Sequence, residues 1–167
     1  LQGERAFFRN DHQLAWIDYR RSLALGGDRE TLETDQIELL LFGLDQDWAG
    51  VRVRTALPPA EAVRAALHLA ARRVTETPFK AYAWSLASDV YFHAARLHRQ
   101  DTPLDLSSLS EDPMEVLRPE DRLGLAALET ASRLEPNNYI YHDLLTEKFL
   151  ELGQTDLAAP YCRRSVA

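Results

Sequence analysis

Histidine, cysteine and serine side chains are the groups in this sequence that could bind a metal or act as nucleophiles. His93 and His98 are five residues apart, which does not place both on one helix face, and no HExxH pattern occurs. Cys162 is the single cysteine, so an internal disulfide and a cysteine-based zinc site are excluded. The serines of segment 107–110 have no GxSxG pattern, and no glycine-rich phosphate loop is present. We therefore expect no catalytic residue, no metal site and no bound cofactor.

Composition sets limits on the class of protein. The chain has 167 residues, of which 46% are hydrophobic and 27% charged, and this is typical of a globular chain with one sizeable core. Its net charge of −7 argues against nucleic acid as a partner. No apolar run reaches the ~20 residues of a membrane-spanning helix, so we expect no direct membrane insertion of this segment.

The positive charge is mostly arginine, with only Lys80 and Lys148 as lysines, which is typical of a protein from a GC-rich bacterial genome. The chain does not begin with Met and stops within a helical pattern. We expect a fragment of a longer bacterial protein, and the sequence leaves open whether that protein is cytoplasmic or periplasmic.

Apolar periodicity and stop signals together predict an all-helical chain. Prolines begin or end several segments, and Gly153 supplies a helix C-cap. The run from Leu39 to Phe42 could be a buried strand, but its polar flanks and length favour a helix. Residues 45–57 are interpreted as an extended connection with Trp48 against the core. The predicted helices are about 11–26, 34–46, 59–76, 79–98, 119–135, 139–152 and 155–167, with a long loop at 100–118.

Two of these helices carry a recognisable pattern of residues. In the 79–98 helix, Trp84, Ala87, Ser88 and Tyr91 stand at the spacing W-x2-L-G-x2-Y. This segment resembles the first helix of a tetratricopeptide (TPR) repeat, whose period is ~34 residues. The segment from residue 139 is similar to a more degenerate copy. Its matching positions are His142, Leu145, Thr146, Phe149, Ala158 and Cys162, and the preceding helix offers Gly124, Leu128 and Pro136.

The resemblance implies an all-α, TPR-like α-solenoid in which antiparallel helix pairs form about three repeats within one domain, 1–167. The two central repeats carry insertions between their helices. It also implies that the repeat positions, Cys162 included, are buried in the core, and that Ala131 sits where two helices nearly touch. Trp16 and Trp48 are less constrained, and either could be an exposed anchor for a partner.

The TPR resemblance further implies a concave groove, lined by the first helix of each repeat, that binds a protein or peptide segment. The matching residues are Tyr82, Ser85, Asp89, Phe92, His93, Ile140, Asp143, Glu147, Leu150 and Glu151. A branch of the family binds the terminal carboxylates of a peptide with Lys and Asn at such positions. This sequence has neither residue at the matching positions. The carboxylates instead predict a partner with basic and apolar residues. A solvated acidic face with no partner is the alternative.

On this interpretation the chain is a protein–protein interaction module and not itself an enzyme. The second interpretation is a helical ligand-binding or accessory domain of an enzyme, with its site between helices or under the 100–118 loop. The periplasmic tail of a membrane polysaccharide polymerase or ligase would be one example, by analogy of fold alone.

Overall fold

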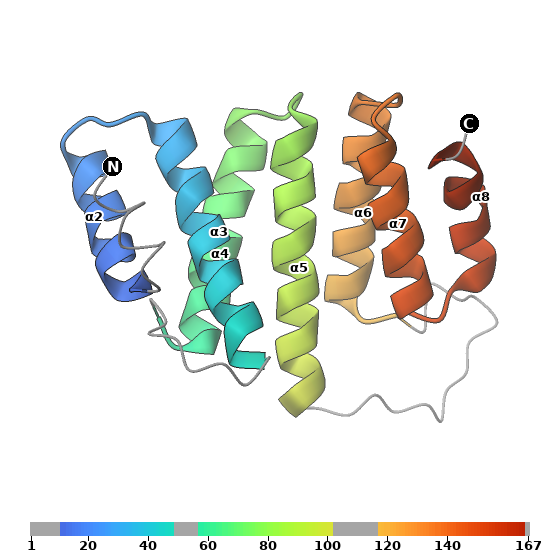
Figure 1. The fold of residues 1–167 in the computed structure, drawn as a ribbon, viewed down its shortest axis with the longest axis horizontal. Helices are drawn as coiled ribbons and strands as arrows, with labels where there is room; N and C mark the ends of the chain where they lie inside the picture. The colour runs from blue at the N-terminus through green and yellow to red at the C-terminus, as the bar shows by residue number, and fades with distance from the viewer. Residues whose placement is uncertain (1–10, 49–56, 102–116, 166–167) are drawn as a thin grey trace. The chain divides into compact units, whose positions relative to one another are not determined.

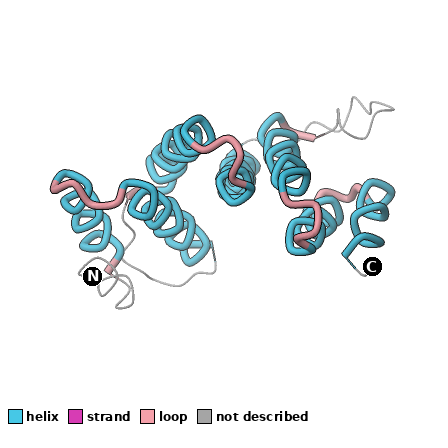
Figure 2. The backbone as a smooth tube through the Cα atoms, turned by 90° about the horizontal axis from the view of Figure 1, so that it is seen from above, coloured by secondary structure: helices cyan, strands magenta, loops and turns pink. Residues whose placement is uncertain are grey.

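The computed structural model describes residues 11–48, 57–101 and 117–165, with side chains at 11–45, 57–98 and 117–163. These residues form seven α-helices and no β-strand (Figures 1 and 2). The helices are α2 (His12–Ala24), α3 (Arg29–Trp48), α4 (Pro59–Glu76), α5 (Ala81–Asp101), α6 (Pro119–Leu134), α7 (Tyr139–Glu151) and α8 (Thr155–Ser165). The expected extended connection at 45–57 is wrong for residues 45–48, which continue helix α3 to Trp48, and residues 49–56 lie outside the described residues. Most of the expected 100–118 loop also lies outside the described residues.

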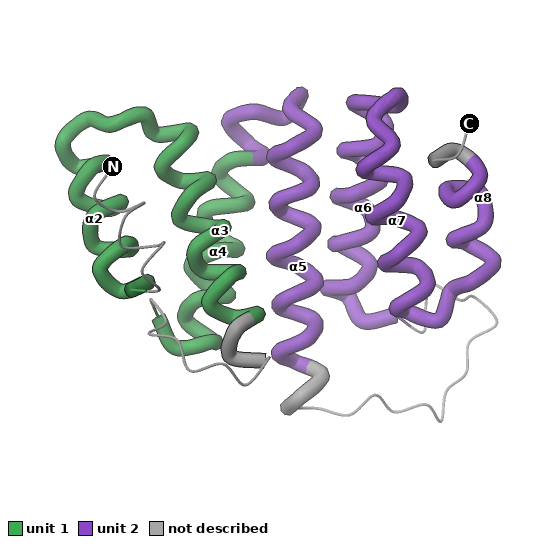
Figure 3. The backbone as a smooth tube through the Cα atoms, in the orientation of Figure 1, with its two compact units in different colours: residues 1–73 green, residues 74–167 purple. Residues whose placement is uncertain are grey.

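The chain divides into two compact units, unit 1 at residues 1–73 and unit 2 at residues 74–167 (Figure 3). In unit 1, the Asp11 carboxylate caps α2 by accepting from the Leu14 backbone N–H at 3.1 Å. Gly26 follows the end of that helix with φ of 82°, a left-handed conformation that glycine adopts without steric cost. Ala15, Tyr19 and Leu39 form a small buried cluster.

Helix α3 begins at Arg29, five residues before the predicted start at residue 34. The Asp28 backbone carbonyl accepts from the Leu32 N–H at 3.1 Å, and the Thr31 hydroxyl donates to the Asp28 carboxylate. That hydroxyl is the main reason why the pKa of Asp28 lies below its ordinary value. A hydrogen bond between the Thr31 hydroxyl and the Asp28 carboxylate therefore marks the first turn of this helix.

Because α3 starts early, Glu33 is part of this helix. Its charge is buried, with only 1% of the side chain exposed. Arg29 donates to it at 2.7 Å, and Arg72 of α4 forms a second ion pair with it. Glu33 lies on the same helix face as Ile37 and Leu40, which are also buried. The carboxylate is held by two cations because a buried charge without partners is strongly unfavourable.

Successive helices of unit 2 run in opposite directions from α5 to α8 (Figure 1). Asn138 caps α7 by accepting from the Ile140 N–H at 3.3 Å, and Gly153 follows its end with φ of 74°, the C-cap conformation expected there. Proline at the first position of α6 fixes a helical backbone angle at no hydrogen-bond cost.

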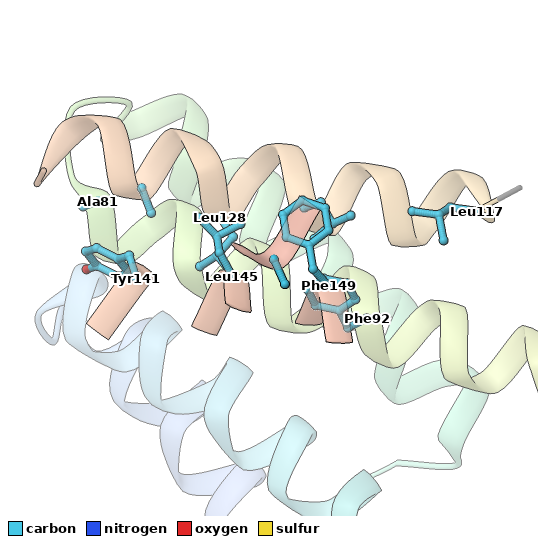
Figure 4. Packing of buried hydrophobic residues seen from close by; sticks show 10 residues of the cluster. Ala81, Phe92, Leu117, Leu128, Tyr141, Leu145 and Phe149 are labelled. Atoms are coloured by element: carbon cyan, nitrogen blue, oxygen red, sulfur yellow. The ribbon is translucent and has the colours of Figure 1, made fainter. Parts of the chain in front are cut away.

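The core of unit 2 forms where α5, α6, α7 and α8 meet (Figure 4). Leu125, Leu128 and Ala131 form a buried apolar stripe on α6, the α6 stripe, and each is at most 2% exposed. Figure 4 shows the cluster as a row, with Ala81 and Tyr141 at one end and Leu117 at the other. The buried members are Ala81, Phe92, Leu117, Leu125, Leu128, Ala131, Tyr141, Leu145, Phe149 and Ala158.

Helices α5 and α6 approach closely at Gly124. A Cβ built on this glycine would lie 3.0 Å from the Phe92 ring, which leaves no comfortable room for a side chain. The glycine therefore lets an aromatic ring of α5 rest directly on the α6 backbone, in keeping with the small residue that the repeat resemblance predicts there.

Candidate partner-binding surface

Helix α7 presents one face to solvent, and this face holds five of the residues predicted to line a groove. Ile140 is 49% exposed and Leu150 is 53% exposed, which is unusual for large apolar side chains at helix positions facing the same way. Three exposed carboxylates lie between or beside them. We call this face the α7 strip and define it as Ile140, Asp143, Glu147, Leu150 and Glu151.

The opposite side of α7 is anchored in the core of unit 2. Leu145 is 0% exposed and Phe149 is 3% exposed. The Tyr161 ring of α8 stacks on Phe149, with ring centres 5.6 Å apart and an interplanar angle of 17°. The Tyr161 hydroxyl also donates to Glu129 of α6 at 2.9 Å. These contacts fix the orientation of α7, and hence the direction in which the strip faces.

The five predicted residues of α5 are placed differently from those of α7. Tyr82 is 50% exposed and Asp89 is partly buried, whereas Ser85, Phe92 and His93 are buried. The His93 ring nitrogen Nδ1 lies 2.7 Å from the Asp89 carbonyl oxygen, the geometry of an N–H donor to that oxygen. Most of the described side chains of α5 are buried, in line with a helix that is apolar on several sides. Of these five residues, Tyr82 and Asp89 are the ones that a partner can reach.

A pocket of about 420 Å³ lies between α5 and α7, next to the α7 strip. Lys148 lies 5.4 Å from the centre of the Phe92 ring and pairs with Glu151 at 2.9 Å. Arg96 also lines this pocket, so its cations outnumber its carboxylate. The sequence predicts carboxylates among apolar residues along the groove, and the structure places these two cations next to them. The resemblance does not predict Arg96 and Lys148 here, because neither stands at a position that the TPR family uses to line its groove.

In unit 2, α5 and α7 each have a ring nitrogen that contacts the carbonyl of a proline just before the helix. The Trp84 indole N–H donates to the Pro78 carbonyl at 2.8 Å. His142, at the matching position of the other repeat, places Nε2 3.1 Å from the Pro136 carbonyl. Its Nδ1 lies 3.3 Å from the Ser132 hydroxyl, which fits a histidine that donates through Nε2 and accepts through Nδ1. We assign His142 a structural role.

Cys162 is exposed, so its predicted place in the core is wrong. The neighbouring Tyr161 fills that place instead, because it stacks on Phe149 from the side of α8 that faces α7. In the parts of the chain that the structure describes, no group of His, Cys, Asp and Glu side chains is arranged to hold a metal. No helix among those residues is both long and apolar enough to cross a membrane.

Comparison with known proteins identifies the fold. No protein-family profile matches the sequence, and no curated protein matches it either. Among solved structures, the chain is similar to a thermophilic TPR protein of Thermus thermophilus, with 17% sequence identity and a TM-score of 0.59. The match covers 98% of this chain and 69% of that protein. The chain has an all-α, TPR-like helical-repeat fold, which is an architecture typical of protein-interaction modules.

Proposed function

We propose that this chain is a protein-interaction module that binds a segment of another protein along the α7 strip, with Tyr82 and Asp89 as further contacts. The proposal assigns the chain binding and not catalysis. One observation carries this proposal: Ile140 and Leu150 are exposed on the same helix face as three carboxylates. Large apolar side chains left in water on a rigid helix face favour a partner that covers them.

The geometry of the strip defines the partner's chemistry. Ile140 and Leu150 are ~15 Å apart along the helix axis, a distance that an extended chain covers in about five residues. Asp143, Glu147 and Glu151 follow one another at roughly one helical turn, ~6 Å, which matches alternate residues of an extended segment. A segment with two apolar residues about five positions apart, and with Arg or Lys at alternate positions between them, complements the strip.

A charge-reversal experiment tests the proposal with defined peptides. The first peptide carries two Leu residues at that separation with Arg at alternate positions between them, and the second has Glu in place of each Arg. We expect the Arg peptide to bind the unaltered chain and to be released by salt, since exposed charges are screened within ~8 Å at physiological ionic strength. Fluorescence anisotropy of labelled peptides gives the affinities.

The variant Asp143→Lys with Glu147→Lys should weaken binding of the Arg peptide and strengthen binding of the Glu peptide. A control variant, Glu61→Lys with Asp156→Lys, changes the net charge by the same amount at exposed positions outside α7. The control should retain the preference for the Arg peptide. If the α7 variant keeps its helicity and binds the Arg peptide as tightly as the unaltered chain does, the strip is not the binding site.

A further inference from the structure

A second cavity lies entirely within unit 1, where α2, α3 and α4 meet. Its volume is about 430 Å³, within the range of ~300–1,000 Å³ that is usual for small-molecule sites. Trp16 and Leu23 of α2 and Leu69 of α4 line it with apolar surface. An aromatic or branched apolar body of moderate size fits such a wall.

Gln36 of α3 also lines this cavity, although it is only 2% exposed. Its Nε2 is inaccessible to water and has no hydrogen-bond partner among the described residues. A buried amide donor without an acceptor is unfavourable, and natural structures retain few of them. The terminal amide of glutamine turns readily about its last side-chain bond, so an oxygen atom placed in the cavity can accept from it.

Two arginines give the cavity a positive character. Arg20 of α2 is exposed at the edge, and Arg72 of α4 lines the cavity while it forms its ion pair with Glu33. Glu33 also binds Arg29, so two arginines share this one carboxylate. A low-dielectric cavity lined by positive charges attracts negatively charged ligands.

We propose that this cavity binds a small organic carboxylate with an aromatic or branched apolar body. The body contacts Trp16, Leu23 and Leu69, and the carboxylate oxygens accept hydrogen bonds from the Gln36 amide and the Arg20 guanidinium. This site is separate from the α7 strip, so it goes beyond the proposed protein-interaction function. Either proposal can fail while the other stands.

The first test uses the unaltered 167-residue chain and two matched probes, 2-naphthoate and the neutral 2-naphthamide. In ¹H–¹⁵N spectra, we expect 2-naphthoate to shift the Trp16 indole N–H and the Gln36 side-chain amide signals. The neutral amide should bind about tenfold more weakly, because charge-assisted hydrogen bonds are the stronger ones. If neither signal moves up to the solubility limit of 2-naphthoate, or if both probes bind equally, the proposal is overturned.

Two variants separate a ligand site from a tolerated packing defect. Gln36→Leu removes the donor at similar size, and we expect it to raise Tm while weakening 2-naphthoate binding ~5–10-fold. Ala65→Leu fills the cavity and should abolish binding, whereas Ala71→Leu, at an exposed position of the same helix, should leave binding unchanged. If Gln36→Leu and Ala65→Leu both fold and both bind 2-naphthoate as the unaltered chain does, the cavity is not the site.

Discussion

Two buried serines in unit 2 have contrasting hydrogen bonding. Ser88 of α5 is 1% exposed, and its hydroxyl has no hydrogen-bond partner among the described residues. Ser132 of α6 is 7% exposed, and its hydroxyl contacts the His142 ring at 3.3 Å. The same side chain therefore stabilises the fold at one position and weakens it at the other, because burial of a hydroxyl is offset only where a partner is present.

Alanine substitutions at these serines should have opposite effects. Ser88→Ala removes an unfavourable buried hydroxyl and should raise the free energy of unfolding by about 1 kcal/mol. Ser132→Ala removes the partner of a buried imidazole nitrogen and should lower it by about 1–3 kcal/mol. Urea denaturation followed by circular dichroism measures both values. A destabilising Ser88→Ala would mean that the hydroxyl has a favourable contact after all.

Tyr141 should make the fold sensitive to alkaline pH. Burial raises the pKa of its phenol above the ordinary value of 10.0, and the negative charge of Glu135 adds to this. As the pH rises through ~10, the unfolded chain loses this proton before the folded chain does, so the free energy of unfolding falls. Tyr141→Phe cannot ionise and should show a shallower fall between roughly pH 9 and 11. Equal pH slopes in urea denaturation of the two proteins would contradict this.

At the scale of single elements, α6 offers the clearest test of packing. Ala131 is 0% exposed, whereas Ala126 on the same helix is exposed. Ala131→Leu should overpack the contact and lower the free energy of unfolding by roughly 1–3 kcal/mol. Ala126→Leu should change it by less than about 0.5 kcal/mol. Equal effects of the two substitutions in urea denaturation would show that the α6 stripe does not set the helix–helix contact.

The elements that the sequence predicts well are those with strong local signals at both ends. Helix α4 has the bounds expected from its starting prolines, and α7 starts at residue 139 as predicted and ends one residue before the predicted 152, with Gly153 just beyond its C-cap. The start of α3 was missed because Asp28 and Thr31, and not the later Thr34, form its first turn. The helical spacing from Glu33 to Ile37 is the signal that places Glu33 on the buried face of this helix.

The candidate binding surface could be predicted only in part, for a related reason. The exposed side of α7 follows from its own periodicity, because its core residues all lie on the other side. Helix α5 has apolar residues on several sides, and its sequence alone does not say which neighbouring helices cover Ser85, Phe92 and His93. The pocket cations Arg96 and Lys148 depend on the packing of two helices, and no pattern within one helix reveals that.

At the scale of the whole molecule, the two compact units should respond separately to core substitutions. Repeat proteins are stabilised mainly by contacts between neighbouring elements, so the effect of a cavity is concentrated near it. Leu145→Ala in unit 2 should cost about 2–5 kcal/mol and speed amide hydrogen exchange chiefly in α5 to α8. Leu39→Ala in unit 1 should speed exchange chiefly in α2 and α3. An even rise across all helices for both variants would contradict this.

The bond from a ring nitrogen to a proline carbonyl has a consequence for how such a chain can diverge. Trp84 and His142 each stand six residues after the proline whose carbonyl they contact, yet their rings differ in size and chemistry. What this position needs is a ring N–H group that reaches the proline carbonyl. Residues as different as Trp and His can supply it. Duplicated helix pairs that keep this group can therefore exchange most of their side chains and still fold alike, so ancestry can outlast any trace of it in residue identity.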